Sequence, residues 1–275
     1  MNHDRPPMAA LLAIAKAAAD AILAVYDRGF EVTAKADHSP LTEADLAAHR
    51  VIVESLATLT PGWPLLSEES AAVPWTERQT WSRYWLVDPL DGTKEFIRRN
   101  GEFTVNIALI EQGRPVLGVV WVPVTGLAYW AAAGVAYSQI PGGPARQLRV
   151  SAPCQTPVRV VGSRSHAGDS LAAFLARLGE HQLVSMGSSL KLCLVAEGKA
   201  DVYPRLGPTS AWDTAAAQAV VEGAGGQVTD LCGVPLCYNT RESLLNPHFL
   251  VFGDASRDWF TCLPPERLSS ERPAP

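Results

Sequence analysis

Apolar side chains recur with a helical period in the first 60 residues of the chain. They are spaced by three or four positions from Met8 to Tyr26, which predicts a helix of about five turns that ends near Gly29. The same spacing predicts a second helix that begins at Thr42 and stops before Pro61. On this second helix, the side chains expected to face inward are Leu46, Val53 and Leu56. The polar stretch 35–39 separates the two helices.

The pattern changes to that of strands from residue 84 onward. Apolar segments separated by turns with Gly or Pro predict an antiparallel meander, with strands at 84–87, 104–110, 116–122 and 127–131. Further strands are predicted at 158–161, 183–186, 201–203 and 249–252. Helices predicted between these later strands lie at 170–178, 188–197 and 211–222. This βαβ-like rhythm after a meander places the chain in the α/β (α+β) class.

We place the boundary between two halves near Ser151. Residues 1–150 would form an N-terminal α+β half that carries most of the acidic loops discussed below. Residues 151–265 would form a C-terminal α/β half that contributes the remaining ones. Residues 266–275 are rich in Pro, Ser and charge, so they are expected to be a disordered tail.

The composition and net charge of the chain argue against nucleic-acid binding and against insertion in a membrane. Of the 275 residues, 47% are apolar and 19% are charged, which is typical of a soluble globular protein. The net charge of -5 and the lack of a long Lys and Arg run argue against a nucleic-acid polymer as partner. Lys16 and Asp20 interrupt the apolar stretch 8–25, which favours a core helix over an integral membrane segment. The expected location is the cytoplasm, with peripheral contact to the inner membrane face as an alternative, and the oligomeric state is open between monomer and homodimer.

The cysteines do not form a recognisable metal or disulfide pattern. Their number is odd and no two of them are spaced as CxxC, which argues against zinc binding and against a disulfide framework. We expect reduced and mostly buried thiols at Cys154, Cys193, Cys232, Cys237 and Cys262.

The strongest chemical signal is the sequence Asp-Pro-Leu-Asp-Gly-Thr at 88–93, which directly follows an apolar strand. Asp88 and Asp91 would point carboxylates into a site while Gly92 permits close backbone approach, and hard oxygen ligands favour magnesium. An ordinary turn closing a strand is the alternative. A phosphoaspartate mechanism of the haloacid dehalogenase type is disfavoured, because that class separates its two aspartates by one residue and here two intervene.

Other acidic residues sit at the ends of predicted elements. Glu68 lies beside a second glutamate after a short apolar strand, where a solvated loop is the alternative to a ligand. Asp213 follows Ser210 by three residues, and Asp45 follows Thr42 by three, so both fit a helix-capping box as well as a site. The free amides of such helix starts also suit a phosphate group.

Taken together and in this order, these motifs resemble the inositol monophosphatase superfamily over about residues 5–260. The wording of the segments 39–45, 93–96, 187–191 and 201–205 is similar to that of CysQ-type 3′(2′),5′-bisphosphate nucleotidases within this superfamily. The resemblance implies a layered αβαβα sandwich. It also implies hydrolysis of adenosine 3′,5′-bisphosphate, which is left over from sulfate activation, to AMP and phosphate.

The resemblance further implies roles for individual residues. Two or three Mg²⁺ ions would be held by Glu68, Asp88, Asp91, Asp213 and the backbone carbonyl of Leu90. A water molecule, oriented by Glu68 and Thr93 and deprotonated with help from Asp45, would attack the phosphorus without a covalent enzyme intermediate. The wider substrate-binding set is Glu68, Leu90, Asp91, Gly92, Thr93, Ser188, Lys191, Arg205 and Asp213. Inhibition by Li⁺ is expected as well.

Substrate choice is assigned to two cations. A second phosphate far from the metals needs cationic or hydroxyl partners, and Lys191 and Arg205, with Ser188 nearby, fit that need. The alternative is a pair of solvated surface cations. Two other functions stay open at this point: hydrolysis of an inositol or sugar monophosphate on the same fold, and a non-catalytic phosphate-ligand sensor.

Overall fold

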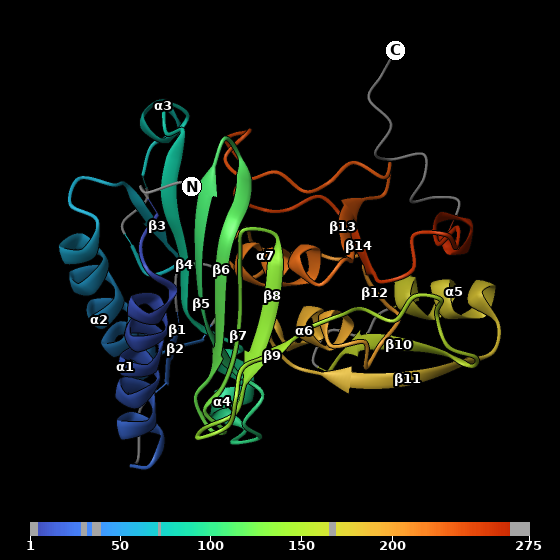
Figure 1. Cartoon of the computed structure of the whole chain (residues 1–275), viewed down its shortest axis with the longest axis horizontal. Helices are drawn as coiled ribbons and strands as arrows, with labels where there is room; N and C mark the ends of the chain where they lie inside the picture. The colour runs from blue at the N-terminus through green and yellow to red at the C-terminus, as the bar shows by residue number, and fades with distance from the viewer. Residues whose placement is uncertain (1–4, 29–31, 35–39, 71–72, 165–168, 265–275) are drawn as a thin grey trace.

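The computed structural model describes residues 5–28, 32–34, 40–70, 73–164 and 169–264. Its elements stack in five layers (Figure 1). Helices α1 (Met8–Tyr26) and α2 (Glu43–Leu59) cover one face of a seven-stranded sheet. Helices α6 (Leu190–Ala196) and α7 (Ala215–Gly223) lie between that sheet and a five-stranded one, whose outer face carries α5 (Asp169–Leu178). The αβαβα sandwich implied by the sequence is therefore confirmed.

The seven-stranded sheet is the predicted meander, extended at both edges. Its order is β3-β4-β5-β6-β7-β8-β9, and every pair is antiparallel except β3 with β4. The strands are β3 (Leu65–Ser67), β4 (Arg83–Asp91), β5 (Thr104–Glu111), β6 (Arg114–Val122), β7 (Leu127–Ala132), β8 (Val135–Gln139) and β9 (Arg146–Gln147). We did not predict β8 and β9, because β8 is short and mixes polar with apolar residues and β9 consists of Arg and Gln alone.

The five-stranded sheet has the order β11-β10-β12-β14-β13. Its strands are β10 (Val158–Ser163), β11 (His181–Met186), β12 (Val202–Arg205), β13 (Gln227–Asp230) and β14 (Phe249–Phe252). Strand β10 is parallel to both of its neighbours, as a βαβ rhythm requires, whereas β14 is antiparallel to both β12 and β13. Strand β13 was not predicted, since only two of its four residues are buried.

Short elements complete the described chain: β1 (Val32–Ala34) paired with β2 (Pro40–Thr42), α3 (Trp75–Arg78), α4 (Thr93–Ile97) and a 3-10 turn, η1 (Phe260–Cys262). Four sequence predictions lie outside the described residues: the helix end near Gly29, the polar stretch 35–39, Ser39 of the segment 39–45, and the tail 266–275.

Strand β4 is buried on both faces, which explains its continuous apolar sequence. Tyr84 and Leu86 point into the core shared with α6 and α7, whereas Trp85 and Val87 point into the core beneath α1 and α2. A shift of one residue would exchange these two sets, so the register of β4 is strongly specified. The strand therefore delivers Asp88 at a fixed position and orientation.

Helix α7 approaches the seven-stranded sheet unusually closely. A Cβ added to Gly118 of β6 would lie 2.9 Å from the carbonyl carbon of Ala216, and closer still to its oxygen. The Ala-rich first turn of α7 and Gly118 thus allow backbone to pack on backbone. This contact fixes the start of α7 relative to the sheet.

Three details of the sequence prediction were wrong. Leu46 is 44% exposed, because the buried stripe of α2 is formed by the smaller Ala44 and Ala48 together with Ile52 and Leu56. The helix predicted from residue 211 begins only at Ala215, after a turn. The thiols are free as expected but not mostly buried, since Cys232 and Cys237 are exposed and Cys154 is half-buried.

By length and composition alone, α1 could span a membrane. In the fold it acts as a core helix instead. Its buried stripe packs against α2 and the seven-stranded sheet and consists of Leu11, Ile14, Ala15, Ala18, Ala19, Ile22 and Val25.

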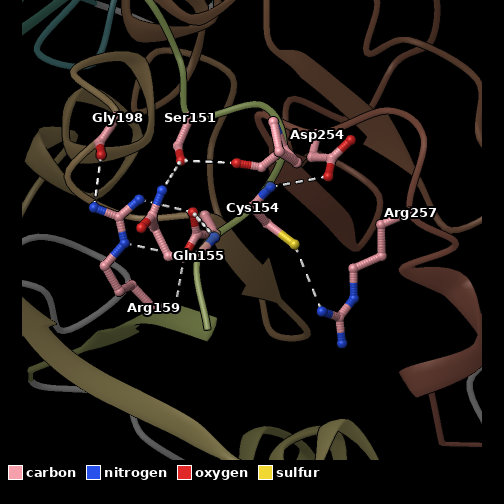
Figure 2. A network of polar contacts seen from close by, with 9 residues as sticks. Ser151, Cys154, Gln155, Arg159, Gly198, Asp254 and Arg257 are labelled. Atoms are coloured by element: carbon pink, nitrogen blue, oxygen red, sulfur yellow. Dashed lines mark hydrogen bonds and ion pairs between the residues drawn. The ribbon is translucent and has the colours of Figure 1, made fainter. Parts of the chain in front are cut away.

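The segment that joins the two sheets is held by buried acids (Figure 2). Asp201, whose side chain is fully buried, accepts hydrogen bonds from the backbone N–H of Arg159 at 2.7 Å and from its guanidinium at 2.7 Å and 3.0 Å. Burial raises the pKa of Asp201, but these bonds and one from the Gln155 backbone lower it by a larger amount. The pKa of Asp201 is therefore below its usual range. Asp254 accepts from the backbone N–H of Cys154 at 2.9 Å. The segment is thereby fastened to the start of β12 and the end of β14.

Replacement of Gly118 by Ala tests the close helix–sheet contact. We expect Gly118→Ala to lower the free energy of unfolding by about 3 kcal/mol, the upper end for an overpacked core, because only backbone atoms could yield. Gly207→Ala is the matched control, since a Cβ there meets no atom within 4 Å and its φ is not positive. Urea unfolding of both variants provides the measurement, and equal small losses would contradict the proposed contact.

Candidate active site

A cavity of about 690 Å³ opens between the two sheets. Its walls include the end of β4 and the start of α4 from the first half, and β12 and the turns before α6 and α7 from the second. Ten of the eleven candidate residues line it: Glu68, Asp88, Leu90, Asp91, Gly92, Thr93, Ser188, Lys191, Arg205 and Asp213. Asp45 does not line the cavity but contacts Thr93, which does. The fold thus brings the whole candidate set into one region.

Three carboxylates converge at one end of the cavity. Glu68, Asp88 and Asp213 each place an oxygen within 4.8 Å of the others, although they come from three separate parts of the chain. Glu68 directly follows β3, and Asp88 lies at the corresponding end of the parallel neighbour β4. Asp213 occupies the turn before α7, where its Oδ2 accepts from the backbone N–H of Ser210 at 3.0 Å. This bond shapes a turn outside the helix, and the N-cap of α7 is Thr214, so the alternative of a Ser210 capping box does not hold for α7.

The electrostatics of this cluster suit a bound cation. Burial, followed by repulsion from Glu68, Asp91 and Asp213, raises the pKa of Asp88 well above its usual range. Burial and repulsion from Asp91 and Glu68 likewise raise the pKa of Asp213. Carboxylates forced this close together favour either protons or a cation of high charge, and an all-oxygen donor set fits a hard divalent ion. The residues present therefore fit a hard divalent cation.

Asp91 is held from behind by a buried network that the sequence analysis missed. Its Oδ2 accepts from the backbone N–H of Ser189 at 2.5 Å and from the side-chain amide of Asn106 at 3.3 Å. The Ser189 hydroxyl in turn donates to Asn106 Oδ1 at 2.9 Å and lies 2.9 Å from the Thr104 hydroxyl. Burial raises the pKa of Asp91 to about 6, against the lowering effects of Lys191 and the Ser189 N–H. An available signal was the polar pair Thr104 and Asn106 within an otherwise apolar central strand.

Asp45 contacts Thr42 and Thr93 through different oxygens. Its Oδ2 accepts from the backbone N–H of Thr42 at 2.8 Å and so completes the predicted capping box of α2. Its Oδ1 accepts from the hydroxyl of Thr93 at 3.3 Å. Capping is therefore confirmed, and it leaves the second oxygen directed at the cavity wall.

Gly92 permits the turn that connects β4 to α4. Its φ of 93° lies in the left-handed region that favours glycine. A Cβ at this position would lie 3.2 Å from the carbonyl oxygen of Glu102 and 3.3 Å from Cβ of Ser188. The loop at 88–93 therefore packs tightly against its neighbours while its other side faces the cavity.

The two candidate selectivity cations both line the cavity, in different surroundings. Lys191 is only 9% exposed and donates to the backbone carbonyl of Ser188, and burial lowers its pKa against the raising effect of Asp91. Arg205 is half-buried and donates to the Thr209 hydroxyl at 2.5 Å and to the Pro208 carbonyl at 2.6 Å. Lys191 is thus not the solvated surface cation of the alternative interpretation.

Comparison with known proteins identifies relatives of this chain. The pattern described as the inositol monophosphatase family matches residues 4–256. The 3′(2′),5′-bisphosphate nucleotidase CysQ of Salmonella typhimurium is 58% identical over 240 residues, covering 86% of this chain and 96% of that protein. The protein of the same name from Escherichia coli K12 is 57% identical with the same coverage.

Solved structures agree with these relatives. The crystal structure of CysQ from Bacteroides thetaiotaomicron, a bacterial member of the inositol monophosphatase family, shares 41% identity at a TM-score of 0.77 and covers 91% of this chain and 98% of its own. An IMPase of Thermotoga maritima superposes with a TM-score of 0.78 at 23% identity, covering 95% and 98%, which is a likeness of fold alone.

Neutralising one acid separates metal binding from folding. In Asp88→Asn the amide oxygen retains the bond from the Leu90 N–H, which spans 3.0 Å in the parent, while the repulsion is relieved. We expect the variant in chelator to melt no lower than the parent, and kcat to fall by about a hundredfold or more. Mg²⁺ should raise the melting temperature of the parent but hardly that of the variant.

Asp213→Asn should behave in the same way, which separates a ligand from a residue that only shapes a turn. A turn-shaping role predicts near-normal kcat with a lowered melting temperature, an outcome that would remove Asp213 from the metal site. Calorimetry with and without Mg²⁺, together with steady-state kinetics, distinguishes the two.

Proposed function

The chain belongs to the inositol monophosphatase family, and on this premise we propose that it is a 3′(2′),5′-bisphosphate nucleotidase that converts adenosine 3′,5′-bisphosphate to AMP and phosphate. The observation that carries the proposal is the placement of an acidic cluster and two cations, Lys191 and Arg205, on the walls of one cavity. A substrate with two separated phosphates needs both features. The sequence identity to the CysQ nucleotidases supports the same reaction.

The metal requirement follows from the donor set. Glu68, Asp88, Asp91 and Asp213, with the carbonyl of Leu90, would hold two or three Mg²⁺ ions. When bound, these ions supply positive charge that offsets the acids and stabilises charge developing on the phosphate and on the leaving oxygen. The protein contributes by holding the ligands in place against their mutual repulsion.

The residues of the chain then orient the attacking water and the phosphate. The Thr93 hydroxyl lies 3.3 Å from Asp45 Oδ1 and 3.5 Å from the carbonyl oxygen of Leu90. When it donates its hydrogen to Asp45, its oxygen can accept a hydrogen from the water. Glu68 accepts the second hydrogen. As the water attacks in line with the leaving ribose oxygen, it passes a proton to the Thr93 hydroxyl, which passes its own hydrogen to Asp45 Oδ1. Because Thr42 fixes Oδ2 of Asp45, the other oxygen stays aimed at Thr93. The amides of Gly92 and Thr93 would donate to the phosphate.

The second phosphate would be bound by the cations that the second half contributes to the cavity. Arg205 now donates to a hydroxyl and a carbonyl, which are neutral acceptors, and a phosphate would provide a charged one. Lys191 and Ser188 line the same cavity. The nucleoside between the two phosphates also needs apolar surface, which Leu206, Leu245 and Phe249 of the lining provide.

A substrate panel tests the proposal directly. We expect kcat/KM to be highest for adenosine 3′,5′-bisphosphate, with inositol and sugar monophosphates well below it, and activity to need Mg²⁺ and to fall with Li⁺. Equal rates for monophosphates would favour the inositol or sugar phosphatase. Absence of turnover on every substrate at saturating Mg²⁺ would favour a sensor, and full activity in chelator would exclude the metal mechanism.

Removal of either selectivity cation should change one substrate only. Lys191→Ala or Arg205→Ala is expected to lower kcat/KM for the bisphosphate by about tenfold to a hundredfold, the value of one charged hydrogen bond, and to leave a monophosphate nearly unaffected. Added salt should shrink the preference. Lys199→Ala is the control, because Lys199 is an exposed cation paired with Glu197 outside the cavity. Equal loss on both substrates would reassign these cations to the reacting phosphate.

A further inference from the structure

Glu102 contacts two segments that line the cavity, at Gly92 and at Gly187. Glu102 itself lies in the loop between α4 and β5 and does not line the cavity. Its Oε2 accepts from the backbone N–H of Gly187 at 2.8 Å. Arg164 donates to both carboxylate oxygens at 2.7 Å. The same guanidinium also donates to the carbonyl of Ser185 at 2.9 Å. Glu102 therefore ties a loop of the first half to the ends of β10 and β11 in the second.

The backbone of Glu102 occupies the space between the two glycine turns of the cavity. Its carbonyl oxygen would lie 3.2 Å from a Cβ added to Gly92 and 2.8 Å from one added to Gly187. Both turns thus rest on the same peptide group. Any movement of the loop around Glu102 would change the spacing between the metal loop at 88–93 and the segment 187–191.

The segment supported in this way is under conformational strain. Ser188 has a φ of 44°, a left-handed conformation that a residue with a side chain rarely adopts. The next amide, that of Ser189, donates to Asp91, and Lys191 follows one turn later. Such a conformation persists only when its surroundings fix it. The bond from the Gly187 N–H to Glu102 fixes the residue that precedes it.

An ordinary surface ion pair would not act in this way. Exposed pairs contribute little and their removal changes nothing specific. Arg164 is 41% exposed, but the side chain of Glu102 is only 19% exposed, binds Nε and Nη2 of Arg164 and also accepts from a main-chain amide. These contacts order a backbone segment as well as two side chains.

We infer that Glu102, with Arg164 as its partner, is a positioning residue for substrate selection. It sets the position of Ser188 and Lys191 relative to the metal loop and contacts neither the reacting groups nor the carboxylate cluster. The inference rests on the proposed function, because it assigns the supported segment to binding of the non-reacting phosphate.

Three substitutions remove different parts of the contact that Glu102 makes with Gly187 and Arg164. Glu102→Ala removes both the amide acceptor and the ion pair, Arg164→Met removes only the ion pair, and Glu102→Gln keeps an acceptor for the Gly187 N–H. We expect Glu102→Ala to raise KM for adenosine 3′,5′-bisphosphate about tenfold and to change kcat less than about threefold. The reason is that displaced Lys191 would lose its charged hydrogen bond to the non-reacting phosphate, which contributes to substrate binding and not to the chemical step. Arg164→Met and Glu102→Gln should fall between this variant and the parent. The Mg²⁺ concentration for half-maximal activity should shift less than KM, because Asn106 still donates to Asp91.

Glu111→Ala is the matched control. Glu111 is similarly buried, with a side chain 16% exposed, and pairs with Arg5 and Arg83 at the other end of β5, away from the cavity. It should lose comparable thermal stability with KM unchanged. If Glu111→Ala and Glu102→Ala alter KM and kcat alike, or if Glu102→Gln is no better than Glu102→Ala, Glu102 is only structural and the inference fails.

Amide hydrogen exchange separates this inference from the proposed function. Exchange across 187–189 should be faster in Glu102→Ala than in the parent and unchanged in Glu111→Ala, whichever phosphate ester the enzyme prefers. A parent that does not prefer the bisphosphate overturns the proposed function, and the KM test then applies to its best substrate. Unchanged exchange in Glu102→Ala would show that Glu102 does not fix the segment 187–189, and would overturn the inference. Should Glu102→Ala not fold, Arg164→Met and Glu102→Gln provide the same comparison.

Discussion

Repulsion among carboxylates is the constraint on which the rest of this structure depends. Glu68, Asp88 and Asp213 lie within 4.8 Å of one another in a cavity where burial already penalises charge. No local segment would adopt this arrangement by itself, since the residues are far apart in the sequence. The five-layer fold supplies the free energy that holds them together, and it does so with elements that leave little freedom: a strand buried on both faces, and a helix packed backbone to backbone on Gly118.

Because of this constraint, the two halves of the chain contribute different residues to the cavity. The seven-stranded sheet brings Glu68 beside Asp88, because β3 runs parallel to β4 and ends at Ser67, which pairs with Val87, and β4 itself ends at Asp91. The second half supplies Asp213 and both cations, Lys191 and Arg205. Contacts behind the cavity then keep the two contributions in register, through Asn106 and Ser189 at Asp91 and through Glu102 at Gly187.

Local patterns sufficed to predict the elements whose own sequence dictates them. The long amphipathic helix α1, the central strands and the Asp-Pro-Leu-Asp-Gly-Thr loop are examples, and the resemblance carried the layer order. Failures occurred where tertiary contacts decide. Leu46 fits a helical stripe yet faces outward, because α2 presents its small alanines to the core. Strand β9 has no apolar residue and exists only as an edge pairing with β8. The ties at Asn106 and Glu102 join residues about 80 positions apart, and no single-sequence periodicity reports such pairs.

In the proposed mechanism, Asp45 would link the reaction to the first turn of α2. One of its oxygens closes the first turn of α2 and the other receives the Thr93 hydroxyl, so a single side chain belongs to both structures. Helix ends fray far more often than whole domains unfold. In the proposed mechanism, Asp45 could accept from Thr93 only while the first turn of α2 is formed, so a local opening of this turn would interrupt catalysis while the two sheets remain folded.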